Sequence, residues 1–322
     1  KTLLQLIYLK MTVLKKDTAA FNKYMATAMH QPRRHSEAKD AFGDTLTAIM
    51  RNHNPRAIGS DDSATLAKVD YDTILRLYKE RFGNAADFTV FITGNIAEDS
   101  VRPLVETWLG SLPTTHTTET IRDYGYYPPK GIIKKHFTAA MKTPQSTVTI
   151  GYTGTLPHTI QTQVLMRCLS GVLQIAYTDR MREKEGGTYG ASVSGQIDKY
   201  PTSRFILQVN FDSDPAKKDK LVSIAYDEIN QIIKNGPSAD YLNKVKENLL
   251  KSYHEQSAEK NATYWSTQSW LLYVYSYDSR LDYEKLVSET TPAAIRDFAK
   301  QLVGQGNLIE VVMDPADGLT HK

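Results

Sequence analysis

Residues 71–95, YDTILRLYKERFGNAADFTVFITGN, and residues 291–315, TPAAIRDFAKQLVGQGNLIEVVMDP, share one pattern: a helical stretch, a turn and an apolar strand. Matching Phe82 with Leu302 brings the two apolar strands into register, and the offset is then 302 − 82 = 220 residues. Such self-similarity at a fixed distance is the sequence sign of a repeated structural unit. The chain is therefore expected to build one domain plan twice.

A second match supports the repeat. FNK at residues 21–23 corresponds to LNK at residues 242–244, at 242 − 21 = 221 residues, and both triplets follow the start of a predicted helix. The second domain is predicted to begin with a strand at residue 131, and 131 − 220 = −89. We therefore expect the first domain to lack about 90 residues of its opening strands in this chain.

Hydrophobic periodicity gives the expected elements. In the first part of the chain these are helices near 2–14, 17–30, 37–51, 71–82 and 98–110 and a strand near 87–94. In the second part they are strands near 131–139, 146–153, 188–197, 204–211 and 307–314 and helices near 159–184, 215–235, 238–256, 260–276, 282–288 and 292–303. Because the strands come in consecutive pairs and do not alternate singly with helices, the pattern favours an α+β fold over a doubly wound parallel one.

The composition changes at residues 113–130, PTTHTTETIRDYGYYPPK, which are rich in Thr, Tyr and Pro and have no apolar period. Such a stretch is typical of an extended linker. We predict two homologous domains, 1–112 (incomplete at its N-terminal side) and 131–315, followed by a tail at 316–322. Each is expected to be an antiparallel sheet with helices packed on one face.

Charge and composition exclude several classes of protein. The 322 residues hold 39 Lys and Arg against 36 Asp and Glu, a net charge of +3 with the signs interspersed, so nucleic-acid binding is unsupported. No apolar run approaches the roughly 18 residues of a membrane span. The single cysteine, Cys168, lies in an apolar helical run, which predicts a buried and inert thiol.

Common catalytic motifs are missing from the sequence. None of the eight histidines forms His-x-x-Glu-His or His-Glu-x-x-His, so we predict no zinc site in this chain. Neither a Gly-x-x-x-x-Gly-Lys loop nor a Gly-x-Ser-x-Gly elbow is present, so no motif supports nucleotide hydrolysis or serine-hydrolase chemistry.

One segment combines polar chemistry with a tight turn: residues 179–196, DRMREKEGGTYGASVSGQ. Arg182 falls in the last turn of a predicted helix, Gly186 and Gly187 allow the chain to turn, and Tyr189 enters the next strand. A guanidinium and a phenol are suited to holding a peptide carbonyl or an oxyanion. Spacing alone favours an ordinary structural interpretation, in which Arg182 complements the helix dipole and Tyr189 is a half-buried strand aromatic.

These residues resemble a known family. Residues 182–190, REKEGGTYG, look like the Arg-x6-Tyr signature in the C-terminal half of pitrilysin-like (inverzincin) zinc metallopeptidases, which include insulin-degrading enzyme and the processing peptidases. Residues 78–84, YKERFGN, the strand at 88–95 and WLGSLP at 108–113 are similar to a domain ending in the same family. The resemblance spans nearly the whole chain.

The resemblance implies four homologous α+β domains in two halves that close around a chamber. The N-terminal half, upstream or on a separate subunit, would bind zinc through His-x-x-Glu-His and a later Glu. This chain would hold no metal and would be inactive alone. Arg182 and Tyr189 would contact the backbone of an unfolded peptide substrate during hydrolysis, and the bacterial members favour a periplasmic location.

Two other functions stay open at this stage. The chain could be a non-proteolytic peptide-binding or scaffold relative of the same family, or an interaction domain in which Arg182 and Tyr189 are buried. The aromatic stretch at 264–277 could be core, because Trp270, Tyr273 and Tyr277 share a helical face, or it could line a substrate chamber.

Overall fold

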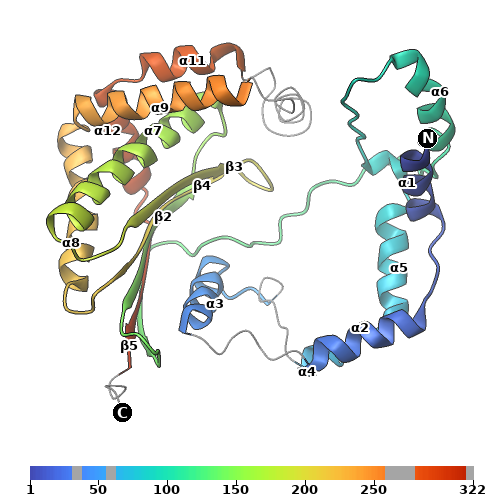
Figure 1. Cartoon of the computed structure of the whole chain (residues 1–322), viewed down its shortest axis with the longest axis horizontal. Coiled ribbons are helices and arrows are strands. Elements are labelled where there is room, and N and C mark those ends of the chain that lie inside the picture. Colours follow the sequence, from blue (N-terminus) through green and yellow to red (C-terminus); the bar gives the residue numbers. More distant parts are fainter. Residues whose placement is uncertain (31–37, 56–62, 258–279, 317–322) are drawn as a thin grey trace. The chain divides into compact units, whose positions relative to one another are not determined.

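The computed structural model describes residues 1–30, 38–55, 63–257 and 280–316. The chain divides into two compact units. The first unit consists of Lys1–Arg33 and Gly59–Arg122, and the second consists of Arg34–Ile58 and Asp123–Lys322. Figure 1 labels the elements of both units.

The first unit is helical in the part that the structure describes. Its elements are α1 (Thr2–Thr12), α2 (Thr18–His30), α4 (Ser63–Leu66), α5 (Tyr71–Phe82), a 3₁₀ turn (Ala85–Asp87) and α6 (Glu98–Trp108). The N-terminus of α5 is capped by Asp70, whose carboxylate accepts a hydrogen bond from the backbone N–H of Thr73 at 2.8 Å. The helices predicted for this unit are confirmed, and α4 was not predicted.

The strand predicted at 87–94 is wrong. Residues 88–93 pair with no other strand in the described part of the chain. The sequence shows the apolar alternation of a strand, but a strand also needs ladder hydrogen bonds from a neighbour, which alternation does not reveal. Phe88, Val90 and Ile92 are accordingly 40%, 49% and 43% exposed.

The second unit is built around a five-stranded sheet in the order β1-β5-β2-β4-β3. The strands are β1 (Ile132–Ala139), β2 (Ser146–Thr155), β3 (Ala191–Asp198), β4 (Arg204–Ser213) and β5 (Leu308–Pro315). All five predicted strands of this domain are found, and the α+β class is confirmed. The expected antiparallel pairing fails at one edge, because β1 pairs with β5 in parallel. The last strand, β5, lies between β1 and β2 and runs antiparallel to β2. Because β1 and β2 run in opposite directions, β5 is parallel to β1.

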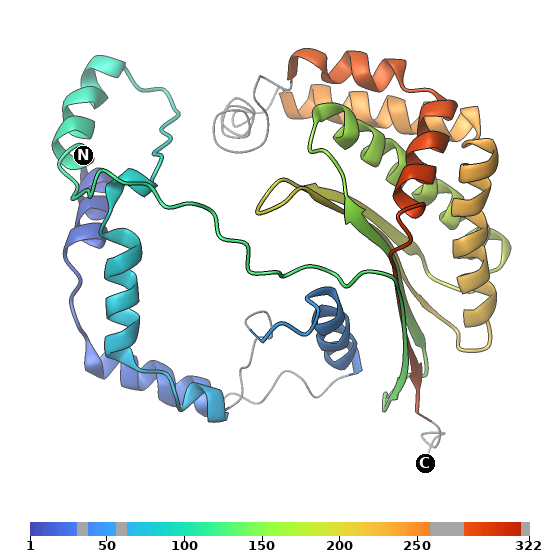
Figure 2. The same cartoon turned by 180° about the vertical axis from the view of Figure 1, so that it is seen from behind.

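One face of this sheet carries a layer of helices (Figures 1 and 2). They are α7 (Ile160–Tyr177), the π-helical η2 (Thr178–Lys184), α8 (Lys218–Asn235), α9 (Ala239–Ser257), α11 (Arg280–Glu289) and α12 (Pro292–Val303). Apolar side chains of β2, β4 and the helices form the main core. The predicted helix at 260–276 and the aromatic stretch at 264–277 lie outside the described residues.

Helix α3 (Ala38–Met50) covers part of the opposite sheet face. Phe42 and Ile49 of this helix pack with Ile309, Val311 and Met313 of β5, while Val312, between them, points into the main core. This is the alternation of side chains that a strand imposes. The structure therefore groups α3 with the sheet of the second unit, although its residues fall in the predicted first domain at 1–112.

The helices repeat at the offset found in the sequence. Both α5 and α12 are 12 residues long, and their first residues are 292 − 71 = 221 positions apart. The first residues of α2 and α9 are likewise 239 − 18 = 221 positions apart. The domain limits themselves remain a prediction.

Candidate functional site

The junction between α7 and β3 has a different local structure from the predicted one. The helix expected at 159–184 ends at Tyr177, and Thr178–Lys184 continue as a π-helical turn. The wider turn is closed by a hydrogen bond from the N–H of Glu185 to the carbonyl of Arg180 at 3.1 Å. Single π-helical turns inside α-helices often occur at functional sites.

Two side chains explain why the helix widens here. Met181 is fully buried in the core, and Arg180 donates a hydrogen bond to the carboxylate of Glu228 on α8 at 2.5 Å. Just before this turn, the buried hydroxyl of Tyr177 donates to the carbonyl of Ala225 at 2.9 Å. The wide turn thus lets consecutive residues reach the core and α8.

Arg182 lies on the outer side of the same turn. Its side chain is 57% exposed, and its Nε lies 3.5 Å from the carboxylate of its neighbour Glu183. Tyr189 is 100% exposed. No hydrogen bond or ring contact joins the two side chains in the described structure, so they stand as two separate groups facing solvent. The burial that would favour a purely structural role for Arg182 and Tyr189 is not observed.

The backbone that presents Tyr189 is held in place by its neighbour. Sequence placed Tyr189 at the start of a strand, but β3 begins two residues later, at Ala191. The hydroxyl of Thr188 accepts a hydrogen bond from the N–H of Gly190 at 3.1 Å and donates to the carbonyl of Asp212 at 2.5 Å. These contacts take the place of strand pairing just before β3 begins.

The glycine turn before Tyr189 is also fixed. Gly186 has φ of +56°, a left-handed conformation that glycine adopts easily. Lys217 donates through Nζ to the carbonyls of Glu185 at 3.0 Å and Gly186 at 3.2 Å. A Cβ on Gly187 would lie 3.0 Å from Leu221, so this residue packs closely on α8. The exposed phenol is therefore carried by a loop with a defined backbone.

Sequence reasoning missed two glutamines of α7 that contact the outer edge of β3. Gln174 donates through Nε2 to the carbonyl of Ala191 at 2.7 Å and accepts from the N–H of Val193 at 2.9 Å. Gln163 donates to the carbonyl of Ile197 at 3.1 Å. The signal was present in the spacing, because the two glutamines are eleven residues apart, about three helical turns, and so lie on one face of α7.

A network of charged and polar groups lies around Asp314, near the C-terminal end of β5. Asp314 on β5 is 2.7 Å from both Nε2 of His136 and Nζ of Lys218, and it also accepts from the hydroxyl of Ser146. Burial alone would raise the pKa of Asp314, but the hydrogen bonds from Lys218, Ser146 and His136 bring it below its ordinary value. The network ties together β1, β2, β5 and α8.

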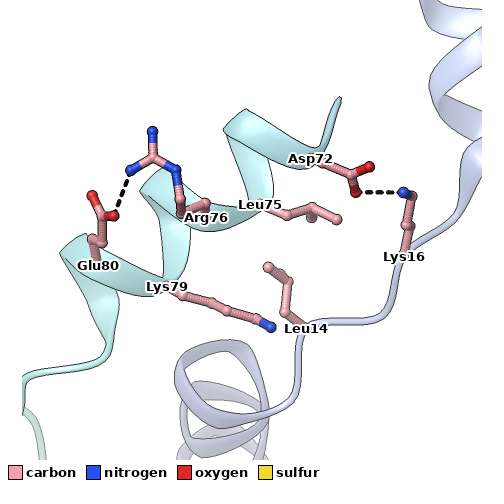
Figure 3. A pocket seen from close by; sticks show the side chains of 7 residues that line it. All are labelled: Leu14, Lys16, Asp72, Leu75, Arg76, Lys79 and Glu80. Atoms are coloured by element: carbon pink, nitrogen blue, oxygen red, sulfur yellow. Dashed lines mark hydrogen bonds and ion pairs between the residues drawn. The ribbon is translucent and has the colours of Figure 1, made fainter. Parts of the chain in front are cut away.

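The first unit has a hollow of about 470 Å³ between α5 and the segment that follows α1 (Figure 3). It is lined by Leu14, Lys16, Asp72, Leu75, Arg76, Lys79 and Glu80. Four of its charges are paired: Lys16 with Asp72, and Arg76 with Glu80 at 2.5 Å. Exposed pairs of this kind contribute little to stability.

The described residues do not fit a zinc ion. In those ranges no three His, Cys, Asp or Glu side chains come together as ligands. The thiol of Cys168 is buried, and burial raises its pKa to about 11, as expected for an inert core cysteine. None of the described helices is long and apolar enough to cross a membrane.

Comparison with known proteins identifies relatives of this chain. The family model "Peptidase M16 inactive domain" matches residues 68–249. A zinc protease PQQL-like protein of Arabidopsis thaliana is 25% identical over 62% of this chain and 22% of its own length. The probable zinc protease PqqL of Haemophilus influenzae is 23% identical over 76% of this chain and 26% of its own length. The chain thus spans about a quarter of the length of these curated relatives.

Solved structures share the fold. The periplasmic protease PqqL from Escherichia coli superposes with a TM-score of 0.78 at 18% identity, covering 97% of this chain and 34% of the protease. A peptidase M16 inactive domain from Pseudomonas fluorescens gives a TM-score of 0.74 at 14% identity over 99% of this chain and 76% of that one. Since the family model covers residues 68–249, more than half of the 322 residues, the chain belongs to the inactive-domain family of the pitrilysin-like M16 zinc peptidases.

Proposed function

We propose that this chain holds the peptide substrate of an M16 zinc peptidase, and that Arg182 and Tyr189 contact the peptide backbone. The observation that carries the proposal is the exposure of Tyr189, whose phenol is 100% accessible although its backbone is tied down by Thr188. A large aromatic side chain fully exposed on a fixed backbone is available for a ligand.

The chemistry of both groups suits a peptide carbonyl. The hydroxyl of Tyr189 can donate one hydrogen bond, and the guanidinium of Arg182 can donate several in a planar fork. Among the described residues, the side chain of Arg182 pairs only with that of Glu183, at 3.5 Å. Both side chains are more than half exposed, so this contact is easily given up.

Hydrolysis itself would belong to the longer protein. The described residues provide no ligand set for zinc, so the metal and the general base would come from the N-terminal half, upstream or on a separate subunit. An unfolded peptide would then lie between that half and the surface that carries Tyr189. The periplasm is the proposed location, because the Escherichia coli protease that shares this fold is periplasmic.

The experiment compares peptide hydrolysis by the longer protease carrying the native sequence, Tyr189→Phe or Arg182→Ala. Slower hydrolysis with unchanged folding supports a role in substrate contact. Hydrolysis at the native rate by both variants contradicts it. If the longer protein with its native sequence cleaves no peptide but binds one at this surface, the chain is the non-proteolytic relative that the sequence leaves open.

A further inference from the structure

The outer edge of β3 is the feature that extends this proposal. In the sheet order β1-β5-β2-β4-β3, β3 is the last strand, and it pairs only with β4 in the described structure. An edge strand carries backbone donors and acceptors on its outer side, and these can pair with another extended chain. Tyr189 lies two residues before β3 begins.

The contacts of Gln174 show which backbone groups face outward. The N–H of Val193 donates to the side chain of Gln174 and therefore points away from β4. In an antiparallel pair such residues alternate with those that bond the neighbouring strand, so Gly195 and Ile197 share the outer edge with Val193. Ser194 and Gln196, between them, bond to β4.

The side-chain amide of Gln174 already behaves as one peptide unit of an adjacent strand. It donates to the carbonyl of Ala191 and accepts from the N–H of Val193, the two bonds that a neighbouring backbone would make there. Gln163 occupies the carbonyl of Ile197 at the far end. Between the two glutamines, the carbonyl of Val193, both backbone groups of Gly195 and the N–H of Ile197 have no protein partner in the described structure.

The helix above this stretch adds a second polar group. The hydroxyl of Ser170 on α7 is buried and has no hydrogen-bond partner within the described residues. It lies close to the backbone of Gly195, since a Cβ built there would be 2.4 Å from the hydroxyl oxygen. Ser170 is seven residues after Gln163 and four before Gln174, so the three polar side chains share one stripe of α7. An unsatisfied donor beside unsatisfied backbone groups points to a polar occupant.

We infer that the edge of β3 between Gln163 and Gln174 binds an extended peptide by backbone pairing. This inference rests on the proposed function, because it extends the contact at Tyr189 into a subsite for the same substrate. Backbone pairing recognises any extended peptide regardless of its sequence, with specificity left to pockets for alternate side chains.

Amide hydrogen exchange of the 322-residue chain tests the inference with a short unstructured peptide as the probe. Bound peptide is expected to slow exchange at Gly195 and Ile197 by about tenfold or more, while Ser194 and Gln196, already bonded to β4, keep their rates. The same peptide with alternate backbone amides N-methylated is expected to lose this protection.

A variant pair sharpens the test. Gln174→Ala removes the side-chain amide from the edge, so the protected stretch is expected to extend to the N–H of Val193. The matched control is Gln196→Ala on the same strand, because the side chain of Gln196 is exposed and bonds Asp198, not the edge. With this control, protection is expected to stay at Gly195 and Ile197.

Three results overturn the inference: unchanged exchange at Gly195 and Ile197 with bound peptide, equal binding of the N-methylated peptide, or no binding at about 1 mM peptide, where weak complexes still form. Failure of the proposed function is separate. It shows as native hydrolysis by the Tyr189→Phe and Arg182→Ala proteases, whereas protection of the β3 amides is measured without hydrolysis.

Discussion

The guanidinium of Arg180 and the carboxylate of Glu228 form a 2.5 Å ion pair between the π-helical turn and α8. Two residues later in the same turn, Arg182 faces solvent with a side chain 57% exposed. One arginine therefore links the turn to α8, and the other stays exposed to solvent. This division of roles can be tested with matched substitutions.

Arg180→Ala is expected to lower the free energy of unfolding by about 1–3 kcal/mol, because it leaves the carboxylate of Glu228, only 15% exposed, without its charged partner. Urea unfolding followed by circular dichroism measures the change. Arg182→Ala is the control, expected to stay within about 0.5 kcal/mol of the native chain because its side chain is exposed. Equal losses in the two variants would show that the turn does not depend on the pair with Glu228.

The positions of the elements could be predicted because their signals are local. Alternation marks β4, a short apolar run marks β5, and the 3.6-residue period marks α5 and α12. These signals do not depend on distant parts of the chain. The strand predicted at 87–94 failed for the complementary reason. Phe88, Val90 and Ile92 have the right period, but a strand also needs a neighbour, and residues 88–93 have none in the described structure.

The candidate site could be proposed from the sequence only at the level of residue types. Gly186 and Gly187 indicated the turn, and Arg182 and Tyr189 stood out beside it. The π-helical turn could not be predicted, because it depends on Met181 reaching a core assembled from α7, α8 and the sheet. Two other features also depend on tertiary structure, which a local sequence pattern does not encode. They are the parallel pairing of β1 with β5 and the contact of Gln174 with β3.

Tyr189→Phe is expected to lower kcat of the longer protease by about 10²–10³-fold, as the loss of one oxyanion donor does. Its free energy of unfolding is expected to change by less than about 0.5 kcal/mol, because the phenol is fully exposed and makes no contact that stabilises the fold. Steady-state peptide hydrolysis and urea unfolding check the two parts separately.

Tyr200→Phe is a control for the loss of an accessible phenol elsewhere on the unit, since Tyr200 is 44% exposed. This variant is expected to keep the native kcat. If Tyr189→Phe also keeps it, the hydroxyl of Tyr189 has no part in hydrolysis.

Asp314→Asn is expected to lower the free energy of unfolding at neutral pH by about 1–3 kcal/mol, because it removes the charge that accepts from Lys218 and His136. The pKa of Asp314 in the folded chain is below its ordinary value of 3.8. A depressed carboxyl pKa stabilises the fold above the unfolded-state pKa, and this contribution is lost as the pH falls through the folded-state pKa.

The native chain should therefore lose stability more steeply than Asp314→Asn as the pH is lowered below about 4. Urea unfolding over an acidic pH series measures both slopes. Asp282→Asn, which changes an exposed carboxylate on α11, is expected to leave the stability at neutral pH within about 0.5 kcal/mol of the native value. Parallel acid profiles for the native chain and Asp314→Asn would mean that the network does not contribute through ionisation.

Two glycines inside helices are expected to respond to alanine with opposite signs. A Cβ on Gly171 of α7 would lie 2.7 Å from Cγ1 and 3.0 Å from Cγ2 of Val245 on α9. Valine is branched at Cβ and cannot turn aside easily, so Gly171→Ala has to push the two helices apart. We expect it to cost about 1–3 kcal/mol of the free energy of unfolding, the range for overpacking a core.

A Cβ built on Gly43 of α3 would meet no other described residue within 4 Å. Gly43→Ala therefore adds no clash and restricts the unfolded chain, which is expected to stabilise α3 against the sheet by about 0.4–1 kcal/mol. Thermal and urea unfolding of both variants test the pair. Phe42 and Ile49 pack α3 on β5. If Gly43→Ala stabilises the same unfolding transition that Gly171→Ala destabilises, α3 unfolds together with the sheet of the second unit. A separate transition that responds only to Gly43→Ala would show that α3 comes off the sheet before the rest of the unit unfolds.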